Sequence, residues 1–194
     1  MKKILLAAAL VVGCASAFAQ ATPFTGFNAA IGLSFGNSSA KLDSNLGSTS
    51  TGEDSVWGIL SGEYGFAVSP KAVIGVGASI DLGDTKYGNQ SALGTTVSLK
   101  AKDKYSVFVA PGYALSNNTL AFVKLGYHHA KGELGAQSES FNGFGIGLGV
   151  RTMLDKNMFL QLEATRVDYS RKDVLGGSIK PSSTFGTLSV GYHF

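Results

Sequence analysis

Charged side chains inside apolar segments are the first candidates for chemistry in this sequence. A lone charge in an apolar interior is costly, whereas opposite charges within reach of one another offset that cost. Such pairs could form a static core that fills the interior, or a gate in which a cation exchanges one carboxylate partner for another. Both alternatives need a fold that turns the charges toward one interior, and we favour the static core. The candidates are Glu63, Asp81, Lys124, Arg151 and Glu163.

Three other patterns in the sequence lack the arrangement of residues that a metal site, a nucleotide-binding loop or a lipid deacylase would require. His128 and His129 are adjacent and would face opposite sides of a strand, so they cannot bind one metal ion together. Glycines alternate from Gly143 to Gly149 within one segment, whereas a nucleotide-binding loop needs a strand before it and a helix after it. No histidine lies in the His-x-Ser pattern of the outer-membrane lipid deacylases. We therefore predict no catalytic residue, no metal site and no cofactor.

Alternating apolar residues predict the strands that would position the charges. The odd positions from Phe27 to Phe35 are apolar, and similar period-two stripes run from Ile74 to Leu82 and from Phe144 to Val150. Pro111 falls inside another such segment and cannot donate a ladder hydrogen bond, so we expect a bulge or a strand end there. The predicted strands are 24–35, 55–67, 72–84, 96–114, 119–130, 141–153, 158–170 and 184–194.

The predicted connections alternate between short and long. Tight turns fall at 69–71, 116–118 and 155–157, whereas the segments 36–54, 85–95, 131–140 and 171–183 are longer, polar and rich in Gly, Ser and Asn. Short periplasmic turns and longer external loops are typical of transmembrane barrels, as are aromatic girdles at the strand ends. Tyr64 and Tyr113 would lie in the turn-side girdle, and Phe35 and Tyr127 in the loop-side girdle. The sequence predicts an all-β fold, an eight-stranded antiparallel up-and-down transmembrane β-barrel.

The first residues have the features of an export signal rather than of the fold. Two lysines precede an apolar run at residues 4–12, and Ala17-Phe18-Ala19 is a small-residue cleavage site. We expect residues 1–19 to be a cleaved signal peptide, with the cut between Ala19 and Gln20, and residues 20–194 to form a single barrel domain. Lipidation of Cys14 is the open alternative, because Val-Val-Gly-Cys is similar to a lipobox.

Removal of this signal changes the charge and the cysteine content. The chain has 16 Lys and Arg against 13 Asp and Glu, and two of the lysines lie in residues 1–19, which leaves 14 against 13, or +1. A chain this close to neutral gives no argument for nucleic-acid binding. Cys14 is the only cysteine, so the exported barrel would have no disulfide.

The pattern resembles a known family. Eight Gly-rich alternating segments, the phrase Val109-Ala110-Pro111-Gly112-Tyr113-Ala114 and a terminal Tyr192-His193-Phe194 are similar to the small Gram-negative outer-membrane β-barrels of the OmpA/OmpX-like and porin-like group. The resemblance implies residence in the cell outer membrane. It also implies that Tyr192 and Phe194 form an assembly signal, because the barrel-assembly machinery reads the family's terminal aromatic residue.

Basic residues near the outer end of the last hairpin are the remaining candidates. They could bind lipopolysaccharide phosphates through charge-assisted hydrogen bonds, or they could form a plain solvated rim. They are Arg166, Arg171, Lys172 and Lys180.

For function, we expect a monomer with a structural or surface-interaction role, in adhesion or membrane integrity, carried by external loops that contact an unidentified surface ligand. The alternatives are a narrow porin-like channel for small solutes and a lipid-modifying enzyme.

Overall fold

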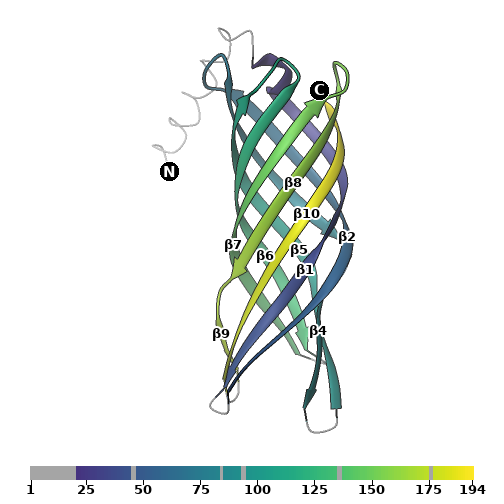
Figure 1. Cartoon of the computed structure of the whole chain (residues 1–194), viewed down its shortest axis with the longest axis vertical. Helices are drawn as coiled ribbons and strands as arrows, with labels where there is room; N and C mark the ends of the chain where they lie inside the picture. The colour runs from purple at the N-terminus through teal and green to yellow at the C-terminus, as the bar shows by residue number, and fades with distance from the viewer. Residues whose placement is uncertain (1–20, 45–46, 84, 93–94, 135–136, 175–176) are drawn as a thin grey trace, which may run out of the picture.

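The computed structural model describes residues 21–44, 47–83, 85–92, 95–134, 137–174 and 177–194. In these ranges the chain forms one antiparallel sheet in which β1 pairs with both β2 and β10, so the sheet closes into a barrel (Figure 1). A short 3-10 helix, η1, precedes β1. The elements are η1 Thr22–Phe24, β1 Gly26–Ser44, β2 Gly47–Ala67, β3 Ala72–Leu82, β4 Thr85–Ala92, β5 Thr95–Ala114, β6 Thr119–Leu134, β7 Gln137–Met153, β8 Met158–Tyr169, β9 Lys172–Val174 and β10 Gly177–His193.

The ten strands correspond to the eight strands of a closed barrel, each of which we call a wall, because two short strands continue a neighbouring one. β4 pairs with β5 beyond the end of β3, and β9 pairs with β10 beyond the end of β8, so each extends the wall before it. Neighbouring walls follow chain order. The predicted eight-stranded up-and-down barrel is confirmed.

Three tight turns join the walls at the end of the barrel where the chain terminates. Backbone hydrogen bonds close them, from Val68 N to the Ala72 carbonyl (2.9 Å), from Leu115 N to the Thr119 carbonyl (2.8 Å) and from Leu154 N to the Met158 carbonyl (2.8 Å). In the third turn, backbone N–H groups donate to the Asp155 carboxylate and hold its pKa below the usual value. The predicted turns are confirmed.

The predicted long loops are wrong at the level of secondary structure. Most of residues 36–54, 85–95, 131–140 and 171–183 lie in strands that extend the hairpins beyond the apolar band. The β1–β10 register runs unbroken from Asn28 opposite His193 to Ser44 opposite Gly177. Because serine, threonine and glycine occupy both faces of these extensions, the apolar alternation disappears while the backbone ladder continues.

The expectation of a bulge or strand end at Pro111 is also wrong. β5 continues to Ala114, and Pro111 lies opposite Ile74 with no change of register against β6 on either side. The irregularity falls instead between Lys102 and Tyr105, where Asp103 has a φ of 48°. The ladder therefore tolerates the missing donor of Pro111 at one position, and the bulge occurs where apolar alternation is interrupted.

The two faces of the sheet differ in burial. On β7, Phe144 and Leu148 are 75% and 63% exposed on the outer face, whereas Phe159 on the inner face of β8 is 1% exposed. Apolar residues outside and buried residues inside match a barrel that faces lipid. Among the described residues, none of the helical structure is long and apolar enough to cross a membrane.

Candidate functional site

The barrel lumen holds all five of the charged residues selected from the sequence. The pair nearest the turn side joins Arg151 of β7 to Glu63 of β2, with Arg151 Nη1 2.8 Å from a Glu63 carboxylate oxygen. Arg151 Nε also donates to Gln161 Oε1 at 2.8 Å, and its guanidinium lies 4.6 Å from the ring centre of Phe159. Arg151 is 4% exposed, so these contacts replace nearly all of its hydration.

A second pair lies farther from the turn side, in the middle of the lumen. The Lys124 ammonium donates to both carboxylate oxygens of Glu163, at 3.1 and 3.0 Å. The Thr165 hydroxyl donates to the same carboxylate at 2.6 Å, and the ammonium lies 4.1 Å from the ring centre of Phe108. Gln161 also donates to Glu163, at 3.4 Å, and so links this pair to Arg151.

The third pair, toward the outer end, includes a residue that the sequence analysis missed. Lys104 of β5 lies 2.7 Å from Asp81 and 4.2 Å from the ring centre of Trp57. From Lys104 to Ala110 the even-numbered residues of β5 face the lumen. This alternation could have identified Lys104 as an inward-facing charge. Asp103 and Ala101 interrupt the apolar phase just before it, and the bulge there hides that signal.

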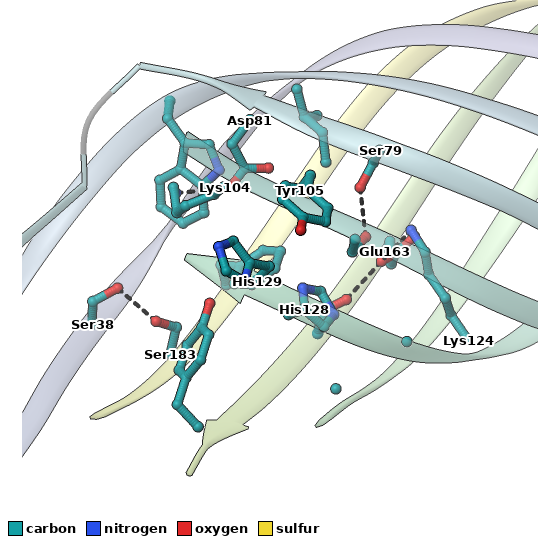
Figure 2. Close-up of a pocket in the computed structure, with 18 residues that line it drawn as sticks. Ser38, Ser79, Asp81, Lys104, Tyr105, Lys124, His128, His129, Glu163 and Ser183 are labelled. Carbon is teal, nitrogen blue, oxygen red and sulfur yellow. Dashed lines mark hydrogen bonds and ion pairs between the residues drawn. The ribbon is translucent and has the colours of Figure 1, made fainter. Parts of the chain in front are cut away.

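A small cavity lies between the Lys124–Glu163 pair and the Asp81–Lys104 pair. Figure 2 shows Asp81 and Lys104 on one side of it, Lys124 and Glu163 on the other, and the Ser38–Ser183 hydrogen bond along its wall. The cavity measures about 30 Å³, room for about two water molecules. Trp57 Nε1 is buried in its lining without a hydrogen-bond partner among the described atoms.

Apolar clusters lie in the lumen on both sides of the ion pairs. At the turn side, Phe24 (1% exposed) and Ala21 pack with Val73, Leu120 and Phe159. The outer cluster consists of Ala40, Ala101, Ala130, Val167 and Tyr169, with Phe141, Ile179 and Phe185 packed against it. The described side chains therefore fill much of the lumen on both sides of the ion pairs.

Glycines on the inner face make room for the aromatic side chains. A Cβ at Gly149 would collide with the ring of Phe122, and one at Gly191 would collide with the ring of Phe159. The ring of Phe122 therefore packs over Gly149 of β7, and the ring of Phe159 packs over Gly191 of β10.

The adjacent histidines face opposite ways. His128 lines the lumen cavity, whereas the ring of His129 stacks on Tyr105 outside, and its Nδ1 lies 2.7 Å from Asn142 Oδ1. Among the described residues, His, Asp, Glu and Cys form no group of three or more that could hold a metal ion.

The four basic residues selected near the outer end do not form one patch. Arg166 of β8 pairs with Asp168 on the same strand at 3.2 Å, and Lys172 of β9 pairs with Glu139 of β7 at 3.6 Å. Lys180 is exposed directly opposite Lys41 in the β1–β10 ladder. Arg171 is exposed between β8 and β9.

The carboxy-terminal aromatic residues lie on the outer face at the turn side. Phe194 N donates to the Phe27 carbonyl at 2.9 Å, and the Phe194 ring lies 5.5 Å from Phe27 and 4.9 Å from Tyr192. The expected signal peptide, the Ala19–Gln20 cleavage site and Cys14 lie outside the described residues.

Comparisons with known proteins agree with this geometry. A family model described as "Outer membrane protein beta-barrel domain" matches residues 5–194. Among solved structures, the chain is similar to the outer membrane protein OprG from Pseudomonas aeruginosa, with a TM-score of 0.51, 13% identity and coverage of 88% of this chain and 96% of that one. It is also similar to Neisserial surface protein A, with a TM-score of 0.50, 18% identity and coverage of 88% and 98%. No curated protein sequence matches. Likeness at these identities shows the fold alone.

Proposed function

The chain belongs to the outer membrane protein beta-barrel domain family, and on that basis we propose that it acts at the cell surface through its outer hairpins. The protein lies in the cell outer membrane. The observation that supports a surface role is the filled lumen, in which three ion pairs lie between two apolar clusters. With the interior occupied, the outer hairpins are the part of the molecule available to a partner.

The same observation argues against the narrow channel. A continuous path would need the Arg151–Glu63 pair, the Lys124–Glu163 pair and both apolar clusters to move aside. Eight-stranded barrels have an interior just wide enough for side chains to fill, and here the cavity that lies between the described side chains of the two outer ion pairs measures about 30 Å³.

The outer hairpins have the form of a binding surface. Beyond Phe35, β1 presents the exposed polar residues Asn37 and Lys41 on its outer face. Asn37 donates to Asp54 at 3.1 Å, and Ser39 is hydrogen bonded to Ser182 at 3.1 Å. The unbroken ladder with β10 and β2 holds this surface in one conformation, which lowers the entropy cost of binding.

We propose that this surface mediates attachment or supports membrane integrity. A lipid-modifying enzyme is a separate hypothesis, and a change in the mass of lipid A in cells that express the protein would support it. Expression without any mass change would argue against it.

A shortened hairpin tests the proposal. Lys41 lies opposite Ser50 in the β1–β2 register, so residues 42–49 can be replaced by an Asn-Gly turn that joins these two positions without a shift of register. The readout is attachment of expressing bacteria to cultured epithelial cells, at equal surface levels measured by labelling. The control replaces Ser116-Asn117-Asn118, a turn at the opposite end, with another short turn.

We expect wild-type expression to increase attachment, the shortened hairpin to abolish that increase and the control turn to preserve it. Both variants should migrate as folded barrels in unboiled gel samples. Equal attachment by the wild-type and shortened proteins would contradict the proposal, as would wild-type protein that gives no increase.

A further inference from the structure

An arginine in the outer aromatic girdle lies at the rim of an apolar groove on the lipid-facing wall. The groove measures about 960 Å³ and runs over β3, β5, β6, β7 and β8. Its apolar lining includes Val76, Val107, Leu125 and Ile146, and Arg166 and Asp168 belong to the same lining. A groove of this composition suits an acyl chain.

The position of Arg166 relative to the membrane follows from the strand register. Arg166 lies opposite Ile146 on β7, and Asp168 lies opposite Phe144. Phe144 packs edge-on against Tyr127 at 5.5 Å, within the loop-side girdle. Arg166 is therefore at the outer interface, where an arginine on the lipid face is tolerated, rather than at the midplane, where it is costly.

The guanidinium is available for a ligand. The Arg166 side chain is 60% exposed, and its contact with Asp168 is an exposed pair between residues of one strand. Nε and Nη2 of Arg166 donate to the two carboxylate oxygens of Asp168 at 3.2 and 3.4 Å, so a ligand phosphate would compete with this carboxylate for the guanidinium. A phosphate could take two parallel hydrogen bonds from the guanidinium.

We propose that the groove and Arg166 form a specific site for lipid A, with an acyl chain in the groove and a phosphate on the guanidinium. The short turns and the chain end mark the periplasmic side, so Arg166 faces the outer leaflet, which lipopolysaccharide forms. Among the four basic residues considered above, this assigns the lipid contact to Arg166. The site is independent of the role proposed for the outer hairpins, and either can fail without the other.

The test uses the exported chain refolded in detergent without added lipid, and native mass spectrometry to measure bound lipid. The probes are diphosphoryl lipid A, dephosphorylated lipid A and phosphatidylglycerol. The variants are Arg166→Gln, Asp168→Asn and Ala78→Phe, which fills the groove. The matched control is Lys71→Gln, which removes an exposed cation from a periplasmic turn.

We expect Arg166→Gln to weaken binding of diphosphoryl lipid A about tenfold and Lys71→Gln to leave it unchanged. Asp168→Asn should strengthen binding, because the guanidinium loses its competing carboxylate, whereas simple damage to the site would weaken it. Ala78→Phe should weaken binding of both forms of lipid A.

Four results would overturn the proposal. They are unchanged binding in Arg166→Gln, weaker binding in Asp168→Asn, equal affinity for dephosphorylated lipid A, and phosphatidylglycerol binding with the same affinity and the same dependence on Arg166. The last result would assign the site to phosphate headgroups in general rather than to lipid A. Gel mobility of unboiled samples establishes that each variant is folded.

Discussion

At the scale of single residues, the lumen shows how charges are accommodated in the interior of a narrow barrel. Arg151 has a carboxylate, an amide oxygen and an aromatic ring as neighbours, and each replaces part of its hydration. Glu163 accepts hydrogen bonds from Lys124 and Thr165. Removing one partner of such a buried pair destabilises a protein strongly, whereas replacing both partners by well-packed apolar residues is often neutral or stabilising. Their effect is best seen when one partner is removed.

Arg151→Leu should destabilise the barrel by about 3–5 kcal/mol, because it leaves the Glu63 carboxylate buried without its cation. Arg171→Leu, at an exposed position, should cost about 0–1 kcal/mol. Urea unfolding of the refolded proteins measures both. The double variant Arg151→Leu with Glu63→Gln should recover part of the loss, and equal urea midpoints for the two single variants would refute the buried pairing.

Gly191→Ala should destabilise the barrel by about 1–3 kcal/mol, the usual range for overpacking. The new Cβ would meet the ring of Phe159, so Phe159→Leu in the same chain should relieve the strain. Gly62→Ala is the matched control, because its Cβ would make only ordinary contacts of 3.7 Å with Phe27. Equal stability of the two alanine variants would contradict this packing.

At the scale of strands, the barrel depends on the closure of β10 against β1. Hydrogen bonds hold the end of the terminal strand, from Phe194 N to the Phe27 carbonyl at 2.9 Å, from His193 N to the Asn157 carbonyl at 2.6 Å and from Asn157 Nδ2 to the His193 carbonyl at 2.9 Å. An unpaired edge in lipid would leave backbone groups without hydrogen bonds. The last residues therefore affect both closure and the proposed recognition by the assembly machinery.

Deletion of Phe194 should reduce the fraction of folded barrel in the outer membrane, whereas Phe194→Tyr should assemble normally because it keeps a terminal aromatic ring. Unboiled gel mobility of membrane fractions measures the folded fraction. If the purified deletion variant refolds normally in detergent, the defect belongs to recognition in the cell. Normal assembly of the deletion variant in cells would contradict the proposed assembly signal.

The membrane-spanning half of each strand could be predicted from the sequence, because lipid imposes apolar residues at every second position. The stripe from Phe27 to Phe35 is such a case, and its side chains face outward as expected. The outer half of β1 could not, since water on the outside and polar neighbours within remove the alternation. The inward direction of Arg151 could be predicted, because it alternates with outward-facing apolar residues on its strand. Its partner, Glu63, could not, because the relative heights of residues on distant strands depend on the stagger of the whole barrel, which the pattern of one strand does not encode.

At the scale of the whole molecule, closure and filling act together. Eight walls give a narrow interior, and the apolar cluster around Phe24 closes it near the periplasmic end. The cluster around Tyr169 closes it near the outer end. The hairpins then continue past the membrane as a paired ladder (Figure 1). This form is the basis of the surface role proposed above.

The central claim is that the lumen is closed, and single-channel recording in planar bilayers tests it most directly. The exported chain should insert without producing long-lived current steps, across a range of voltages and salt concentrations. Insertion is established independently by protease protection of the barrel in the same lipid. The Phe24→Ala, Phe159→Ala double variant should begin to show brief openings, since it removes large side chains from the periplasmic cluster. Stable openings by the wild-type barrel, reproduced between preparations, would contradict the account.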